Sequence, residues 1–435
     1  MSIRVLTAWL LLTLSLAMLY PAKAEAAAVP PVILVIKIDG VINPVAAEFL
    51  EKSIARASGE KAAALVIMLD TPGGLDSSMR QMVKAIIASP VPVITYVAPS
   101  GARAASAGVF ITLASPVAAM APGTNIGAAH PVSMGGEKLD STMAAKVEND
   151  AAAYIRGLAD KYGRDADWAE DAVRKSVSIS EREALKKGVV DLVANNLDDL
   201  LGKVDGRKAE TEFGPVVLHT KGARVERMEP GFRLGLLKVI VDPNIAYVLM
   251  MLGVIGLFFE LSNPGLILPG VVGGISLVLA FYAFQTLPVN YAGFMLILLA
   301  IIMFIAEVKV TSYGLLAVAG VISLVLGSIM LIDSPLPFMR ISLKLILPTA
   351  AALTAFFLLL MRVAIRSRRR RPTTGSEALV GETGEARTDI GPEGDVFIEG
   401  AHWSAYSDKP VKKGEKVTVV DVKGLKLKVK KTGEV

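Results

Sequence analysis

The stretch PSGARAASAGVFITLAS, residues 99–115, decides how the first half of this sequence is interpreted, because it places one serine among small residues. Ser106 lies at the centre of AASAG, with no histidine near it in the sequence. If Ser106 begins a helix or a sharp turn, the helix dipole and the Ala107 N–H point at any negative charge that develops on a substrate. The same small residues suit close helix packing. Ser106 is therefore a candidate nucleophile, with a packing role as the alternative.

Hydrophobic runs alternate with helix-like stretches around Ser106, from residue 30 to about 205. The strand candidates are nearly continuous apolar runs, typical of a sheet covered on both faces: PVILVIKIDGVI (31–42), AALVIMLDTPGG (63–74), VPVITYVA (91–98) and VFITLASPVAAMA (109–121). Helices are predicted over 43–58, 74–89 and 141–163. The pattern predicts an α/β domain with repeated crossovers, over residues 25–205.

Residues 179–204 open with a capping box, in which Ser180 is followed three positions later by Glu183. Gly188 suits the position just past a short helix. A short helix, a turn, a short strand and another helix are predicted here. Residues 206–240 carry mixed charge with little periodicity and are interpreted as a linker that approaches a membrane.

The chain has 435 residues, of which 53% are hydrophobic, so it is too long for one domain and too apolar for one soluble globule. Residues 1–24 have the features of a signal peptide, with an uncleaved anchor as the alternative. Hydrophobic segments predict a transmembrane domain of about five helices over 241–365, in which recurring glycines indicate close packing. The basic linker 366–375, which begins RSRRRR, follows the last segment. Its position favours a cytoplasmic membrane flank over nucleic-acid contact.

Residues 376–435 contain short alternating runs separated by Gly and Pro turns. This pattern predicts a small all-β barrel similar to an oligonucleotide-binding (OB) fold. Barrel shape alone does not imply nucleic acid. A role in protein interaction or assembly is favoured, and no nucleic-acid partner is expected.

The residue inventory restricts the chemistry that the chain can carry. It has no cysteine and three histidines, His130, His219 and His402. A thiolate nucleophile and a disulfide framework are excluded, and a histidine-rich metal site has almost no candidates. We predict neither a cofactor nor a metal.

Two further motifs accompany Ser106. The turn LDTPGG contains Gly73 and Gly74, whose backbone N–H groups can approach a developing oxyanion closely; a plain tight turn is the alternative. The helix over 141–163 carries Lys146 beside its apolar face. A buried lysine held neutral can accept a proton from serine, whereas a surface lysine would pair with Asp150 four residues on.

The chain resembles the long form of the NfeD family of membrane-bound serine proteases. The resemblance rests on the motifs described above, on the hydrophobic segments and on the terminal barrel. The resemblance also rests on APGTNIGAAHPV and KVENDAAAYIRGLA, and it covers nearly the whole chain. It implies a ClpP/crotonase-like fold for the first domain, a multi-span membrane domain and an OB-like NfeD domain. It further implies a periplasmic or extracellular protease domain. Five spans after a signal peptide would return the chain to the cytoplasm, so the barrel is expected there. A homo-oligomer is also expected.

The same resemblance implies an ATP-independent Ser-Lys dyad, with Ser106 as nucleophile and Lys146 as general base. The N–H groups of Gly74 and Ala107 would bind the oxyanion, and Gly73 would shape the turn. His130 with Asp70 offers a Ser-His-Asp triad, but the family analogy favours a structural or substrate-contact role for His130. The implied substrate is a hydrophobic segment of a stomatin-like partner. The alternatives are a non-catalytic scaffold for stomatin-like assemblies and a crotonase-type acyl-CoA enzyme.

Overall fold

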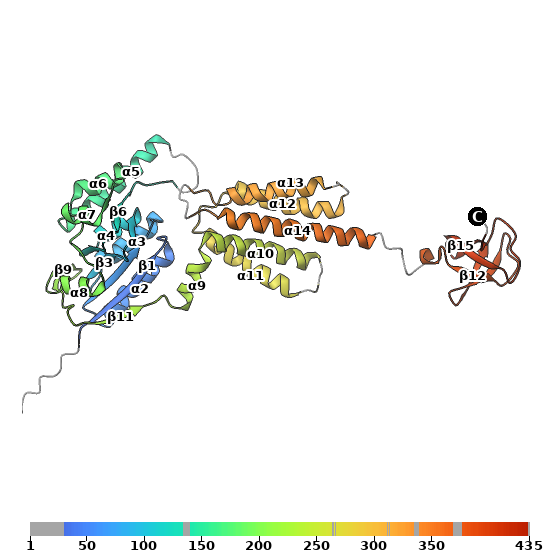
Figure 1. Ribbon diagram of the computed structural model, residues 1–435, viewed down its shortest axis with the longest axis horizontal. Helices are drawn as coiled ribbons and strands as arrows, with labels where there is room; N and C mark the ends of the chain where they lie inside the picture. Colours follow the sequence, from blue (N-terminus) through green and yellow to red (C-terminus); the bar gives the residue numbers. More distant parts are fainter. Residues whose placement is uncertain are drawn as a thin grey trace, which may run out of the picture. The chain divides into compact units, whose positions relative to one another are not determined.

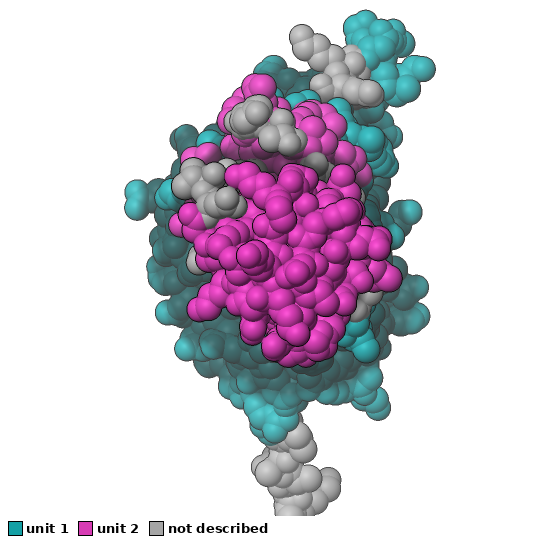
Figure 2. All heavy atoms as spheres, turned by 90° about the vertical axis from the view of Figure 1, so that its right-hand side faces the viewer, with its two compact units in different colours: residues 1–295, 326–346 teal, residues 296–325, 347–435 magenta. Residues whose placement is uncertain are grey.

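The computed structural model describes residues 30–133, 140–262, 265, 267–310, 312, 314–334, 339–368 and 376–433. The chain forms two compact units, residues 1–295 with 326–346 and residues 296–325 with 347–435, which Figure 2 colours separately. The signal peptide expected over 1–24 lies outside the described residues, as does most of the basic linker 366–375.

A six-stranded parallel sheet forms the centre of the N-terminal domain (Figure 1). Three of its strands lie where the sequence predicts them. In spatial order the strands are β11 (Arg224–Met228), β1 (Val32–Asp39), β2 (Ala64–Asp70), β3 (Val93–Val97), β5 (Val117–Met120) and β8 (Leu192–Val193). The prediction of an α/β crossover domain is confirmed.

Alternate residues of β1 enter two separate apolar cores, one on each face of the sheet. Leu34 and Ile36 join the larger core, which is completed by α2 (Pro44–Gly59), α3 (Asp76–Ile87), α4 (Ala107–Leu113), α5 (Ser141–Lys161) and α6 (Ala166–Arg174). Ile33 and Val35 face the opposite core with α8 (Leu197–Val204). Burial on both faces explains the nearly continuous apolar strands.

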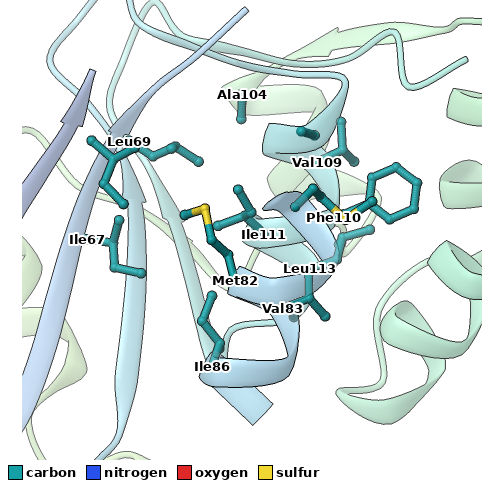
Figure 3. Packing of buried hydrophobic residues seen from close by; sticks show 14 of the residues in the cluster. Ile67, Leu69, Met82, Val83, Ile86, Ala104, Val109, Phe110, Ile111 and Leu113 are labelled. Carbon is teal, nitrogen blue, oxygen red and sulfur yellow. The ribbon is translucent and has the colours of Figure 1, made fainter. Parts of the chain in front are cut away.

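The strand expected over residues 109–121 is wrong in its first half, because residues 107–113 form the helix α4. All seven residues of α4 are buried. A short segment buried on every side has no polar face, so periodicity does not separate helix from strand. Figure 3 shows Val109, Ile111 and Leu113 of α4 in the core beside Met82 of α3.

The linker expected over 206–240 is also wrong, because this segment is folded. It contains β9 (Lys208–Thr211), β10 (Gly214–Val217), β11 and α9 (Phe232–Ile240). β11 pairs in parallel with β1, from Val32 opposite Arg224 to Ile36 opposite Met228. Its charged side chains lie on an edge strand, where polar residues are tolerated. β11 therefore lacks the apolar run by which the central strands were predicted.

The capping box at Ser180 is present: its hydroxyl accepts from the Glu183 N–H, and the Glu183 carboxylate accepts from the Ser180 N–H. The helix α7 (Glu181–Lys186) follows, and Gly188 has a φ of 72° just after it. β8 and α8 complete the predicted order of elements. These local signals are confirmed because they depend on neighbouring residues alone.

Within the described residues, five apolar helices follow the first domain, which agrees with the predicted number of hydrophobic segments. α10 (Pro243–Ser262) and α11 (Ile267–Phe284) are long and apolar enough to cross a membrane. Next come α12 (Tyr291–Lys309), α13 (Leu315–Met330) and α14 (Leu343–Arg368), whose apolar stretches are shorter. A methyl group added at Gly256 would lie 2.7 Å from Gly273 Cα, so glycines bring α10 and α11 together as expected.

The C-terminal segment forms a closed five-stranded barrel in the order β12-β13-β14-β16-β15, which confirms the predicted OB-like fold. Its strands are β12 (Thr383–Ala386), β13 (Gly394–Ile398), β14 (Ala401–Tyr406), β15 (Lys416–Lys423) and β16 (Lys426–Lys431). Aliphatic side chains such as Val396 and Leu427 fill its core.

Candidate active site

Ser106 lies at a strained junction between a strand and a helix. The strand β4 (Arg103–Ala105) leads into it, and α4 begins at the next residue. Ser106 has φ 52° and ψ −114°, a conformation that L-residues rarely adopt and that exposes the side chain of a nucleophile on a tight turn. Its N–H donates to the Gly127 carbonyl at 3.1 Å. Within the described part of the chain, its hydroxyl forms no hydrogen bond.

A small second sheet fixes this junction. β4 pairs in parallel with β6 (Asn125–Gly127), which pairs antiparallel with β7 (Ser178–Ser180). On its other side, β4 contacts Thr71 at the end of β2, where the Thr71 N–H donates to the Arg103 carbonyl at 2.8 Å. The serine turn is therefore held between the glycine turn that follows β2 and the strand that precedes the GAAHPV loop.

The structure brings the predicted glycine turn directly against the predicted nucleophile. Gly73 has a φ of 118°, and a methyl group added there would lie 2.7 Å from Ser106 Cβ and 3.1 Å from Ser106 Oγ. The Thr71 hydroxyl accepts from the Gly73 N–H at 3.0 Å. At Gly74, an added methyl group would lie 2.0 Å from the Ile42 carbonyl oxygen. Both positions therefore require glycine.

The three predicted oxyanion residues differ in what their N–H groups do. The Gly73 N–H is occupied by Thr71. Among the described residues, neither the Gly74 N–H nor the Ala107 N–H donates a hydrogen bond. Ala107 directly follows Ser106 in the chain and Gly74 directly follows Gly73, so both N–H groups remain available near the serine turn.

The small residues around Ser106 also serve packing. A methyl group added at Gly108 would lie 2.7 Å from Thr71 Cγ2 and 3.3 Å from Ala104 Cβ. Ala104 and Ala107 are buried, whereas Ser106 is half-buried. Close packing thus explains the small neighbours, while Ser106 itself keeps access to the surface.

Lys146 lies away from the buried position expected for it. The helix α5 forms as predicted, and Ala151, Ile155 and Leu158 are buried on its apolar face. This face does not extend to the first turns, because Val147 is 39% exposed and Lys146 is exposed. In the described residues, no hydrogen bond or ion pair joins Lys146 to Ser106. Nor does Lys146 pair with Asp150, which pairs with Arg80 instead.

Arg80, which the sequence analysis did not single out, links α3 to α5, the helix that carries Lys146. It extends from α3 to Asp76 at 2.9 Å and to Asp150 on α5, and it lies over the Tyr154 ring at 4.6 Å. Tyr154 in turn stacks on Phe110 of α4 with ring centroids 5.9 Å apart. The one sequence signal for this cluster was the four-residue spacing of Asp76 and Arg80, which is typical of an ion pair on a helix.

Nearby charges and burial shift the pKa values of Arg80 and Tyr154 in opposite directions. Burial lowers the pKa of the Arg80 guanidinium, but Asp76 and Asp150 outweigh burial and raise it. Burial raises the pKa of the Tyr154 hydroxyl, while Arg80 acts to lower it. Arg80 therefore stays charged between two carboxylates.

A second arginine holds the same part of α5 from the other side. Arg174 of α6 donates to the Asn149 side chain at 2.8 Å and to Glu148 at 3.4 Å. It also pairs with Glu170 at 2.7 Å. Residues 148–150, one turn after Lys146, are thus fixed by arginines from α3 and α6.

The structure does not assemble a Ser-His-Asp triad from the described residues. His130 Nδ1 lies 2.9 Å from the Val173 carbonyl oxygen. The Asp70 carboxylate accepts from the Arg103 N–H at 3.0 Å. Each of these two side chains therefore contacts a backbone group rather than Ser106. In the described ranges, no group of three or more acidic or histidine side chains forms a metal site.

Fold and site together define a class of protein. The crossover α/β domain has the ClpP-like protease fold, here joined to apolar helices and a small barrel. Three family models match: the NfeD1b N-terminal domain over 32–212, the NfeD integral membrane domain over 244–363, and the NfeD-like C-terminal, partner-binding domain over 376–431. The chain belongs to the NfeD family.

Relatives match along almost the full length. A membrane-bound protease of Pyrococcus horikoshii is 38% identical over 411 residues, 91% of this chain and 92% of that protein. The membrane protein NfeD1b of Bacillus subtilis is 28% identical over 445 residues, 94% of each. A solved structure of a membrane protease from P. horikoshii, described as specific for a stomatin homologue, is 37% identical with a TM-score of 0.43. It covers 49% of this chain and 99% of that one. The chain is thus a membrane protein of this family.

Proposed function

We propose that this protein is a membrane-anchored, ATP-independent serine endopeptidase whose nucleophile is Ser106. The observation that carries the proposal is the contact between Ser106 and Gly73, each of which is followed in the chain by a residue whose N–H is unpaired among the described residues, Ala107 and Gly74. A nucleophile beside two free donors has what acyl transfer requires. The 38% identity to a membrane-bound protease over most of the chain supports the same activity.

In the proposed reaction, Ser106 Oγ attacks the carbonyl carbon of a peptide bond while its proton passes to a neutral amine. The oxyanion accepts hydrogen bonds from the Gly74 and Ala107 N–H groups. Collapse of the tetrahedral intermediate breaks the C–N bond, and the base returns the proton to the leaving amine. A water then hydrolyses the acyl-enzyme and restores the Ser106 hydroxyl.

We propose Lys146 as the base, which requires the first turns of α5 to approach Ser106. Met143 and Val147 form an apolar face on α5 within one turn of Lys146 and are 49% and 39% exposed. A bound apolar peptide would cover this face and remove water from the Lys146 amine. Desolvation favours the neutral amine, which is the form that accepts a proton.

The substrate that we propose is a hydrophobic segment of a stomatin-like membrane partner. Family membership supports this assignment, and the barrel matches a partner-binding domain. The proposed topology has the protease domain in the periplasm or outside the cell and the barrel in the cytoplasm. A homo-oligomer is part of the same proposal.

Cleavage by the full chain in lipid nanodiscs tests the mechanism. Variants Ser106→Ala and Lys146→Ala should each reduce cleavage of an apolar fluorogenic peptide by at least about a thousandfold. Ser141→Ala and Lys84→Ala, which change exposed residues outside the site, should cleave like wild type. The wild-type rate should rise with pH through a single ionisation, because a general base must be unprotonated to accept the serine proton.

Other outcomes would contradict particular parts of the proposal. Full cleavage by Ser106→Ala would exclude Ser106 as nucleophile. Loss of cleavage in His130→Ala alone, with folding intact, would show that histidine is the base. A wild-type protein that binds a stomatin-like partner and cleaves nothing would favour the scaffold alternative.

A further inference from the structure

The helix α9 connects the protease domain to the first apolar helix without a flexible spacer. It spans Phe232–Ile240, and α10 begins at Pro243 after two intervening residues. The Asp242 carboxylate accepts from the Asn244 N–H at 2.8 Å and caps the start of α10. The three Cα–Cα steps from Ile240 to Pro243 span at most roughly 11 Å. The end of α9 is therefore close to the level at which α10 enters the membrane.

One side of α9 is packed onto the protease domain. Leu234 is 4% exposed, and Val241 just after the helix is 6% exposed; both belong to the larger core. Arg233 forms an ion pair with Glu48 on α2. These contacts make α9 part of the folded domain, so its orientation is fixed by the domain.

The other side of α9 presents large apolar side chains to the surroundings. Phe232 is 88% exposed, Leu236 is 48% exposed and Val239 is 54% exposed. Spacings of four and three residues place these three side chains on one face of a helix. The polar side chains of α9 are Arg233 and Lys238, both basic. This combination is typical of a helix that lies in the membrane interface.

We propose that α9 lies in the plane of the membrane interface and inserts Phe232, Leu236 and Val239 among the lipids of the bilayer that α10 enters. Lipid is the occupant because this face is continuous with the start of a membrane span, and two basic side chains flank it. A fixed contact of this kind holds the protease domain on the membrane surface. The proposal does not depend on peptidase activity.

The absence of cysteine makes a direct test possible, because one introduced cysteine carries a unique label. Leu236→Cys and Val239→Cys of the full chain are labelled with nitrobenzoxadiazole and reconstituted into vesicles of phosphatidylcholine and phosphatidylglycerol. Ala55→Cys, at an exposed position on α2, is the aqueous control. Val278→Cys, on α11 at a side chain that is 68% exposed, is the membrane control.

A lipid carrying a nitroxide near its headgroup should quench the labels at 236 and 239 by about half. A nitroxide near the chain end should quench them less, and the reverse should hold at 278. The label at 55 should not be quenched. Labels at 236 and 239 that behave like the label at 55 would overturn the proposal. Blue-shifted emission without quenching by lipid would also overturn it, because a protein surface would then cover α9.

A second variant shows whether the contact depends on the apolar face. Phe232→Glu in the Val239→Cys background should abolish most of the quenching at 239, because a carboxylate resists transfer from water into the interface. Phe232 is almost fully exposed, so the thermal unfolding of this variant should match that of its parent. Quenching that survives the substitution would contradict the proposal.

Discussion

At the scale of single residues, the site depends on backbone positions that few side chains tolerate. Ser106 has a positive φ, and Gly73 opposite it has a φ of 118°. Thr71 holds Gly73 through its hydroxyl, and Gly108 lets α4 approach Thr71. Strain of this kind persists only when the surroundings enforce it. The contact between Ser106 and Gly73 therefore supports the proposed active site more strongly than either motif alone.

Gly73→Ala should reduce cleavage by at least about a hundredfold, because the new methyl group displaces Ser106 or the oxyanion turn. The cost in the free energy of unfolding should be about 1–3 kcal/mol. Gly157→Ala is the matched control, since an added methyl group at this position on α5 meets nothing within 4 Å. It should keep full activity and be stabilised by about 0.5–1 kcal/mol. Near wild-type cleavage by Gly73→Ala would show that the glycine turn does not contribute to catalysis.

At the scale of elements, α5 is anchored in its middle and free at its start. Arg80 and Arg174 hold residues 148–150, and Phe110 holds Tyr154. The first turns, which carry Lys146, are exposed. The proposed approach of Lys146 to Ser106 therefore depends on how these anchors orient α5. We regard Arg80 as a positioning residue for Lys146.

Arg80→Ala should lower kcat several-fold and leave KM nearly unchanged, because α5 loses an anchor that the substrate does not touch. The loss of two partly exposed ion pairs and a cation–π contact should cost about 1–2 kcal/mol in the free energy of unfolding. Arg56→Ala is the control: Arg56 pairs with Glu60 and Glu226, at sites that do not involve α5. Equal losses of kcat in both variants would indicate general destabilisation.

At the scale of the whole molecule, the protease domain continues past residue 205. Ala209 and Leu218 are buried in the core beneath α8, and β11 covers the outer edge of β1. The chain then passes through α9 directly into α10. The N-terminal domain therefore leads into the membrane segment through folded elements.

Two fragments test this boundary. A fragment of residues 30–242, which keeps α9 and Val241 in the larger core, should unfold cooperatively in mild detergent. A fragment of residues 30–205 should aggregate, because it exposes the apolar edge strand β1 and opens the core at Leu218. Size-exclusion chromatography and thermal unfolding measure the difference. Equal behaviour of the two fragments would show that β9, β10 and β11 are dispensable.

The sequence by itself determined the features that depend on neighbouring residues or on long patterns. The capping box at Ser180, three central strands, the apolar helices and the barrel were predictable because each depends on local periodicity, composition or turn chemistry. Only the tertiary structure decided the rest. It placed Gly73 against Ser106, made α4 a helix, folded residues 206–240 and left Lys146 exposed. These outcomes depend on which surfaces meet in space, and packing between distant segments overrides local preference.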